Sequence, residues 1–253
     1  MKTKRQSVRT ALIIISLLLF PITLNWFSPA LIMQGSAEGV INGSFLMFTA
    51  LFLGSLVFGR AWCGWLCPGA GLQELCAKAR GRKVPIGKPD WIKWFIWVPW
   101  IAGIAALAIV AGGYTKVVPL YMFENGISVS ELPNLIVFIG VVALIAGTAL
   151  GVGRRAFCHY ECWMAPFMIV GRKISNAFRL PALRLRADGS RCEKCGKCAV
   201  ACPMSLPVGK MVRSGDMEHT ECVLCGTCVD TCPNGLIEFS FSRRYQRQDP
   251  RTH

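Results

Sequence analysis

Eight of the thirteen cysteines fall into two copies of one spacing, C-x2-C-x2-C-x3-C-P. No other feature constrains the fold as strongly, because this spacing is typical of chains that bind a pair of [4Fe–4S] clusters. In such pairs, three cysteines of one copy and the fourth cysteine of the other copy bind the same cluster. Gly196 and Gly226 let backbone amides approach the sulfurs without a Cβ atom. Pro203 and Pro233 end each copy.

This crossed arrangement assigns the eight cysteines to two [4Fe–4S] clusters. Cluster one is expected to bind Cys192, Cys195, Cys198 and Cys232. Cluster two is expected to bind Cys222, Cys225, Cys228 and Cys202. Zinc is the weaker alternative, since C-x2-C pairs can bind it but the doubled four-cysteine motif is more specific. We therefore expect an α+β bacterial-type 2[4Fe–4S] ferredoxin domain over residues 191–241, with a short strand near 234–241.

The rest of the chain is apolar and indicates a membrane α-helical domain. Charged residues make up 17% of the sequence, against about 25% in soluble domains. Four apolar stretches reach the roughly 20 residues that a helix needs to cross a bilayer core, and backbone groups in lipid must bond internally. The four expected transmembrane helices are about 11–33, 42–60, 92–112 and 132–152. A cleaved signal peptide over residues 1–37 is the weaker alternative, because its apolar run is too long.

Lysine and arginine set the expected orientation. Residues 1–9, the loop 60–88 and the residues after 153 are basic, whereas the two intervening loops are poor in basic residues. We therefore expect a multi-pass protein of a bacterial-type inner (cytoplasmic) membrane, with both termini in the cytoplasm and lipid as a partner. The net charge of +14 is accounted for in this way, and no nucleic-acid-binding module accompanies it.

The membrane part contains an internal repeat of two helix pairs, each followed by a C-x3-C motif. The two copies read RAWCGWLC from Arg60 and RAFCHYEC from Arg155. Together they supply four thiols, the number that a [4Fe–4S] cluster or a tetrahedral metal site needs. We hypothesise a third cluster or metal site made of Cys63, Cys67, Cys158 and Cys162. The alternatives are redox-active dithiols, a transient metal site, or cysteines that only pack.

Other chemistry-bearing residues are expected to play smaller parts. Cys76 is expected to be a packed free thiol. His159 is expected at the surface or beside the site rather than as a ligand. Tryptophans recur every three residues from Trp91 to Trp100, and an interfacial belt is favoured over a quinone site. The chain has three histidines and none lies inside an expected span, so a bis-histidine haem in the membrane is excluded for this chain alone.

These observations divide the chain into four parts. Residues 1–176 form the expected membrane domain, whose segment 163–176 is interpreted as an interfacial amphipathic helix. Residues 177–190 are expected to be a linker, with Pro181 and Gly189 as breakers. The ferredoxin domain over 191–241 follows, and residues 242–253 are polar, basic and expected to be disordered.

The whole chain resembles the NapH-like family of membrane polyferredoxins, whose relatives include quinol dehydrogenase subunits and the C-terminal half of NosR-type proteins. The resemblance rests on four spans, a C-x3-C motif after the second and fourth, and the C-terminal double cluster domain. Cys63-x3-Cys67-Pro68 fits the family's C-x3-C-P, whereas Cys162 is followed by Trp163. The resemblance implies electron transfer between the quinone pool, the clusters and a redox partner.

Together these points predict a membrane-anchored iron–sulfur electron-transfer subunit of a quinone-linked complex, with other redox subunits as partners. It could serve as the electron-transfer subunit of a quinol dehydrogenase, and the sequence names no catalytic residue. One alternative is a metal or cluster assembly factor, or a copper-reducing maturation factor of the CcoG-like type. Another is a redox sensor.

Overall fold

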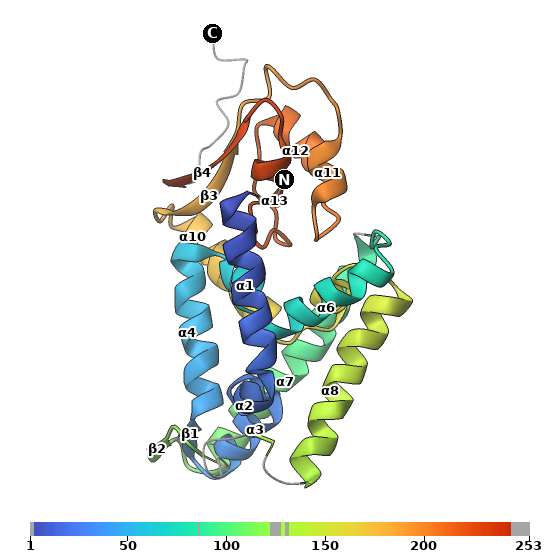
Figure 1. The fold of residues 1–253 in the computed structure, drawn as a ribbon. Helices are drawn as coiled ribbons and strands as arrows, with labels where there is room; N and C mark the ends of the chain where they lie inside the picture. Colours follow the sequence, from blue (N-terminus) through green and yellow to red (C-terminus); the bar gives the residue numbers. More distant parts are fainter. Residues whose placement is uncertain (1–2, 86, 122–127, 130–131, 244–253) are drawn as a thin grey trace.

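The computed structural model describes residues 3–85, 87–121, 128–129 and 132–243. A long helical body carries a smaller domain at one end, and α1 (Lys4–Leu18) begins beside that smaller domain (Figure 1). The body also contains α2 (Phe20–Thr23), η1 (Leu24–Phe27), α3 (Pro29–Ala37), α4 (Gly43–Phe58), α5 (Ala61–Trp65), α6 (Pro68–Ala79), η2 (Lys88–Trp91), α7 (Ile92–Val110), α8 (Leu132–Gly151), α9 (Ala156–Tyr160) and α10 (Ala165–Ala177). Strands β1 (Val40–Asn42) and β2 (Lys116–Val118) pair in parallel at the far end of the body.

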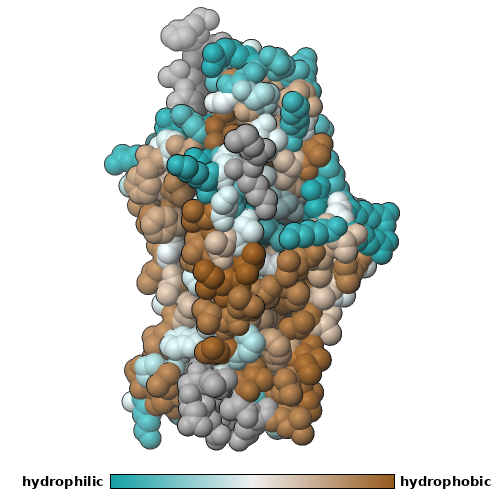
Figure 2. Space-filling view, viewed as in Figure 1, coloured by the Kyte–Doolittle hydropathy of each residue, from teal (hydrophilic) through white to brown (hydrophobic). Residues whose placement is uncertain are grey.

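Two helical segments of the described residues are long and apolar enough to cross a membrane. They are Pro89–Val110, which contains most of η2 and all of α7, and α8. A third span results only if α1 and the segment Phe20–Phe27, which are bent by 59°, form one broken span. Helix α4 is apolar but has 16 residues. The surface of these helices is largely hydrophobic, in contrast to the smaller domain (Figure 2). By length and composition these segments support association with a membrane, and four spans stay a prediction.

The first expected span, 11–33, is corrected by the structure. Its helix begins earlier, at Lys4, and ends at Leu18. Pro21 explains the break, because it lacks an N–H group and its ring crowds the carbonyl four residues back in a continuous helix. A new helix then begins at Pro29, where the side chain of Ser28 accepts a hydrogen bond from the Leu31 N–H.

The smaller domain is built from β3 (Ala182–Ala187), α11 (Lys197–Ala201), α12 (Val208–Ser214), α13 (Thr227–Thr231) and β4 (Ile237–Ser242). Strand β3 pairs antiparallel with β4, from Ala182 opposite Ser242 to Ala187 opposite Ile237. Residues 177–190, expected as a linker, therefore contain a strand of the ferredoxin sheet. The pairing also extends to Ser242, one residue beyond the expected domain end. Of the expected disordered tail, 242–253, Ser242 belongs to β4, and residues 244–253 lie outside the described residues.

One continuous hydrophobic core joins the two parts of the molecule. It runs from Phe27 and Ile32 in the helical body, through the C-x3-C cysteines, to Ile237 in β4. Strand β3 also packs against α4. The ferredoxin domain is therefore docked on the helical body rather than tethered to it, and the cysteines of both parts share one interior.

Candidate functional site

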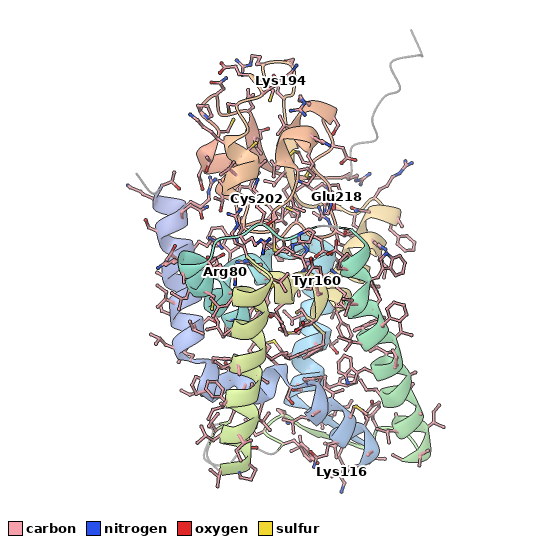
Figure 3. The ribbon with its side chains drawn as sticks, turned by 90° about the vertical axis from the view of Figure 1, so that its right-hand side faces the viewer. Arg80, Lys116, Tyr160, Lys194, Cys202 and Glu218 are labelled. Atoms are coloured by element: carbon pink, nitrogen blue, oxygen red, sulfur yellow. The ribbon has the colours of Figure 1, made fainter. Side chains whose placement is uncertain are left out.

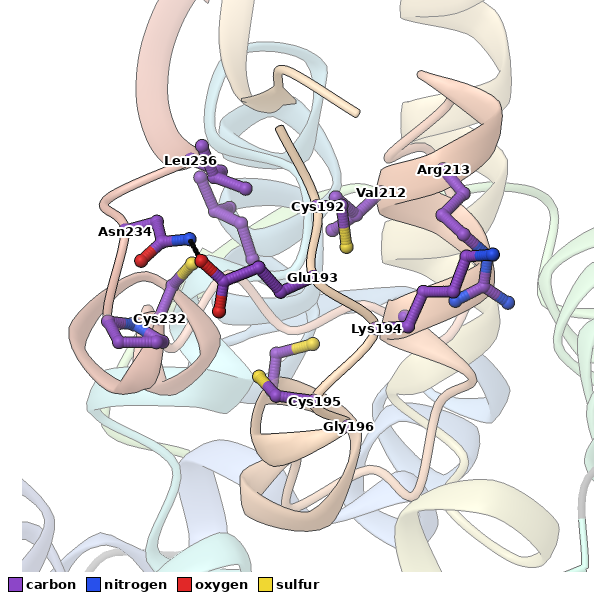
Figure 4. Close-up of a pocket in the computed structure, with 14 residues that line it drawn as sticks. Cys192, Glu193, Lys194, Cys195, Gly196, Val212, Arg213, Cys232, Asn234 and Leu236 are labelled. Carbon is purple, nitrogen blue, oxygen red and sulfur yellow. Dashed lines mark hydrogen bonds between the residues drawn. The ribbon is translucent and has the colours of Figure 1, made fainter. Parts of the chain in front are cut away.

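The first cysteine set surrounds a pocket at the outer end of the ferredoxin domain. Cys192, Cys195, Cys198 and Cys232 all line it. Figure 4 shows this pocket with Cys192, Cys195 and Cys232 around it. Asn234 Nδ2 donates a hydrogen bond of 2.8 Å to Glu193 Oε1 across its rim. Cys195 is exposed, so this pocket opens to solvent.

The second cysteine set lines a separate pocket deeper in the molecule. Its members are Cys202, Cys222, Cys225 and Cys228. Apolar side chains such as Met204 and Val223 complete the wall. Cys202 lies where the ferredoxin domain meets the helical body, whereas Lys194, beside the first set, lies at the far tip (Figure 3). Burial raises the pKa of the Cys222 thiol to about 12, so a thiolate here needs a positive partner such as cluster iron.

The two copies of the motif adopt the same local backbone, which explains how each delivers its cysteines. Lys194 and Leu224 both have left-handed φ angles, 59° and 49°. Gly196 and Gly226 are also left-handed, at 74° and 75°, and each precedes a short helix, α11 or α13. Successive amides in such conformations form concavities that bind anions, including iron–sulfur clusters. The described cysteine loops therefore fit [4Fe–4S] clusters.

No group of three His, Cys, Asp or Glu side chains within the described residues could hold a single metal ion. The eight ferredoxin cysteines and the four cysteines of the C-x3-C motifs are both part of this finding. A cubane distributes four thiolates over four iron atoms, whereas a zinc ion gathers its ligands around one point. The finding therefore concerns sites for a single ion and does not test a cluster.

The structure also brings the four C-x3-C cysteines together. Cys63, Cys67, Cys158 and Cys162 are at most 5% exposed and belong to the same core. Burial raises the pKa of the Cys67 thiol well above its usual range, and the other three cysteines raise it further. Gln73 Nε2 lies 3.1 Å from Cys158 Sγ, and Cys63 Sγ lies 3.9 Å from Met168 Sδ. These four residues are here called the membrane thiols.

Two buried arginines accompany the membrane thiols, one from each copy of the repeat. Arg60 and Arg155 are 2% and 1% exposed. Arg155 Nη1 donates to the Cys63 carbonyl at 2.8 Å, and its Nη2 pairs with Glu74. Arg60 Nε and Nη2 and Arg155 Nε have no hydrogen-bond partner in the described structure. Unpartnered buried donors are costly, and here their positive charge suits thiolates or an anionic cluster.

A buried ion network connects this region to the ferredoxin domain. Glu221 Oε2 accepts a 2.7 Å hydrogen bond from Arg60, and Glu221 Oε1 lies 2.5 Å from Lys93 Nζ. His159 is fully buried, with Nε2 3.0 Å from the Met204 carbonyl and Nδ1 3.2 Å from Asp90 Oδ1. Of the two expected places for His159, at the surface or beside the site, burial leaves the second.

The arginines and Glu221 were not identified as functional from sequence. The signal was available for the arginines, because both repeats begin with Arg-Ala-aromatic-Cys. No sequence signal pointed to Glu221, since its partners Arg60 and Lys93 are 161 and 128 residues away along the chain.

The membrane thiols and the second pocket lie next to each other. A Cβ atom added to Gly64 would lie 2.2 Å from the Val223 carbonyl oxygen, so the two loops are in close backbone contact. Trp65 Nε1 donates to the Leu224 carbonyl at 3.0 Å. Gly64 follows Cys63, and Val223 follows Cys222. A path of adjacent sulfur-bearing loops therefore leads from the helical body to the outer tip.

The remaining residues take other places. Cys76 lies in α6, half-buried, and lines neither cysteine pocket. In the tryptophan stripe, Trp97 and Trp100 pack edge-on against Phe167 with ring centroids 5.3 and 5.8 Å apart. Trp91 is 66% exposed. The stripe is thus partly a packing surface between α7 and α10 and partly exposed.

Comparison with known families supports iron–sulfur chemistry in both parts of the chain. A family described as "4Fe-4S binding domain" matches residues 43–87 and 133–181, which contain the membrane thiols. A family described as "4Fe-4S dicluster domain" matches residues 191–237, which contain the eight ferredoxin cysteines. No solved structure is significantly similar to the chain.

Three curated proteins resemble most of the chain. "Putative electron transport protein YccM" of Escherichia coli K12 is 28% identical over 76% of this chain and 55% of its own length. "Uncharacterized protein MJ0750" and "Uncharacterized protein MJ0749" of Methanocaldococcus jannaschii are 24% and 23% identical, over 75% and 66% of their lengths. The chain spans only about half the length of YccM. It carries 4Fe–4S ferredoxin-type domains and is similar to a protein named for electron transport.

Proposed function

We propose that this chain is a membrane-anchored iron–sulfur electron-transfer protein of the NapH-like type, linking the quinone pool to a redox partner. The observation that carries the proposal is the sorting of the eight ferredoxin cysteines into two pockets, one exposed and one beside the membrane thiols. A [4Fe–4S] cluster, when bound, accepts and donates single electrons. The protein's own part is to order such centres between the membrane and the cytoplasm.

The cysteine assignments follow the pockets. Cluster one is held by Cys192, Cys195, Cys198 and Cys232. Cluster two is held by Cys202, Cys222, Cys225 and Cys228. The exposed first set faces a soluble or peripheral redox subunit, and the buried second set exchanges electrons with the membrane side. Four spans with both termini in the cytoplasm place this domain on the cytoplasmic side.

The membrane thiols form a third centre in this proposal. Two buried arginines with unpartnered N–H groups offset the negative charge that four thiolates bring. Iron analysis tests this directly. Three clusters require about twelve irons per chain and two require about eight. A count near eight that survives replacement of all four membrane thiols by serine would refute the third cluster and leave the ferredoxin assignments intact.

The central test is reduction by quinol. The purified protein, oxidised under anaerobic conditions, is mixed with a menaquinol analogue and followed by EPR and visible absorbance. Cluster reduction within seconds is the expected result. Clusters that dithionite reduces fully but quinol does not reduce at all would contradict the quinone link.

A copper-handling function of the CcoG-like type is the second candidate. The observation that favours it is the 3.9 Å approach of Met168 Sδ to Cys63 Sγ among buried thiols, since thiolate and thioether ligands select Cu(I). Titration of the purified protein with Cu(I) under a competing chelator separates the two. Stoichiometric Cu(I) binding that is lost in Cys63→Ser, with no reduction by quinol, would replace the first proposal by the second.

A further inference from the structure

A cavity lies between α1, α6 and the ferredoxin domain, and neither the cysteine motifs nor the family matches assign it a role. It has a volume of about 400 Å³, within the range of small-molecule sites. Helix α1 packs along α6 on one side, and the ends of α11 and α13 close the other. This cavity is here called the α1–α6 cleft.

One end of the cleft is apolar. Ile14 and Leu75 line it and are 43% and 44% exposed. Ile13 and Gly71 form its floor, where α1 and α6 meet so closely that a Cβ atom on Gly71 would lie 2.8 Å from Ile13. Large exposed apolar side chains on a helix of the membrane body belong in hydrocarbon, and the hydrophobic surface of the body begins along these helices (Figure 2).

The other end is polar and lies against the second cysteine pocket. Thr227 lines the cleft, and its Oγ1 lies 3.4 Å from Cys225 Sγ. Gln6 also lines it and donates to the Cys225 carbonyl at 3.1 Å. Ala201 and Pro203, on either side of Cys202, complete this wall. A molecule in the cleft would therefore touch residues that hold the cluster-two cysteines.

Glu74 links the cleft to the membrane thiols as well. Its carboxylate lies in the cleft wall and pairs with Arg9 and Arg155. Arg155 in turn bonds to the Cys63 carbonyl. Next to Glu74 in sequence, Gln73 contacts Cys158 Sγ. The cleft is therefore adjacent to two of the three proposed redox centres.

We propose that the α1–α6 cleft binds the head group of a membrane quinol, with its isoprenoid tail leaving past Ile14 and Leu75. This inference rests on the proposed function. The apolar end takes a lipid-soluble tail. At the polar end the Glu74 carboxylate, whose side chain is 28% exposed, accepts a hydrogen bond from a quinol hydroxyl, while Arg9, bonded to Gly64 and Glu74, holds that carboxylate in place. A water-soluble substrate does not account for the exposed apolar end, and a plain lipid does not account for the polar wall of residues that adjoin the cluster-two cysteines.

The chemistry balances at this position. Oxidation of one quinol gives one quinone, two protons and two electrons. Two oxidised [4Fe–4S] clusters, one held by Cys202, Cys222, Cys225 and Cys228 and one held by the membrane thiols, would each accept one of these electrons. The protons leave to water near Lys78, which is exposed at the cleft mouth. In the reverse direction the same balance reduces quinone.

The test is photolabelling of the full-length protein in lipid nanodiscs with an azido-quinone, followed by peptide mapping. Labelling within α1 and α6 that excess menaquinone suppresses is the expected result. Labelling confined to other helices, such as the tryptophan face of α7, would overturn the proposal. Equal suppression by an isoprenoid alcohol that lacks the ring would also overturn it, because the cleft would then bind only a lipid tail.

Two matched variants sharpen the test. Ile14→Trp fills the apolar end from an exposed position and should reduce labelling of α1 and α6 about tenfold. Ile15→Trp adds the same ring at a 53% exposed neighbour that does not line the cleft, and should leave labelling unchanged. Unchanged labelling in both variants would count against the cleft. Photolabelling does not depend on bound clusters. A purified protein that contains no iron would refute the proposed function, and its labelling pattern would still test whether the cleft binds quinone.

Discussion

Arg60 and Glu221 form a buried ion pair, 2.7 Å from Nη1 to Oε2, that connects the first C-x3-C motif to the residue before Cys222. Burial alone would raise the pKa of Glu221, but the charges of Arg60 and Lys93 lower it to about 2. One carboxylate therefore neutralises cations from two segments of the helical body. We infer that this pair holds the second cysteine pocket against the membrane thiols.

Replacing Glu221 by glutamine should loosen the ferredoxin domain. The variant leaves two buried cations without a counter-charge, which costs about 3–5 kcal/mol. We expect a lower unfolding temperature and faster cleavage near residues 177–190 by a soluble protease. Glu238→Gln, at an exposed carboxylate of β4, is the control and should leave both measurements unchanged. A Glu221→Gln protein as stable as the wild type would show that the pair does not hold the interface.

Adding a single methyl group at Gly64 should separate the two sulfur-bearing loops. A Cβ atom there would meet the Val223 backbone, and such overpacking costs about 1–3 kcal/mol. We expect Gly64→Ala to lower the unfolding temperature and to broaden the EPR signal of the second pocket's cluster. Gly54→Ala, in α4 with nothing within 4 Å of the added atom, should be neutral or stabilising by up to about 1 kcal/mol. If the two variants behave alike, the loops are not in rigid contact.

Features that depend on residues close together in sequence could be predicted, whereas features that depend on residues far apart in sequence could not. The cysteine pockets could be predicted because their spacing acts within about ten residues, and the same backbone recurs at Gly196 and Gly226. The grouping of the membrane thiols could also be proposed, since the repeat places both C-x3-C motifs after corresponding helices. These features depend on local sequence and on symmetry.

Other features depend on partners that are far away along the chain. The sequence predicts a linker where β3 lies, because β3 pairs with a strand that is distant along the chain. Ala187 at the end of β3 lies opposite Ile237 at the start of β4, 50 residues later. The bend after Leu18 was missed because hydropathy averages over Pro21. The α1–α6 cleft depends on how α1 packs beside α6 and α13, which no linear pattern records.

The contribution of Glu218 to stability should depend on pH. Burial opposes its ionisation, but hydrogen bonds and charges from Arg172 and Arg184 lower its pKa. Its stabilisation is therefore complete above the unfolded-state pKa of about 4.3 and is lost as pH falls towards the lower folded-state pKa. We expect the unfolding temperature to fall with pH below that value. Glu218→Gln should lose about 2 kcal/mol at pH 7 and show less of this fall. Exposed Glu238→Gln is the control.

Crossed binding of the two clusters makes a prediction about which thiols become reactive. If Cys232 binds the cluster of the first pocket, Cys232→Ser should weaken that cluster and expose the three cysteines at 192, 195 and 198 to alkylation. Those at 222, 225 and 228 should stay protected, although they lie in the same motif copy as Cys232. Cys202→Ser should give the opposite pattern.

The measurement is alkylation of the anaerobic, cluster-loaded protein with iodoacetamide, mapped by peptide mass spectrometry. The extent of alkylation at each group of three cysteines is expected to differ at least about tenfold between Cys232→Ser and Cys202→Ser, because the sulfurs of an intact cluster are bound to iron. Cys76→Ser, outside both pockets, is the control and should change neither set. Alkylation of 222, 225 and 228 in Cys232→Ser would mean that each copy binds its own cluster. The two pockets would then not reflect the bound arrangement, and the electron path from buried to exposed centre would have to be redrawn.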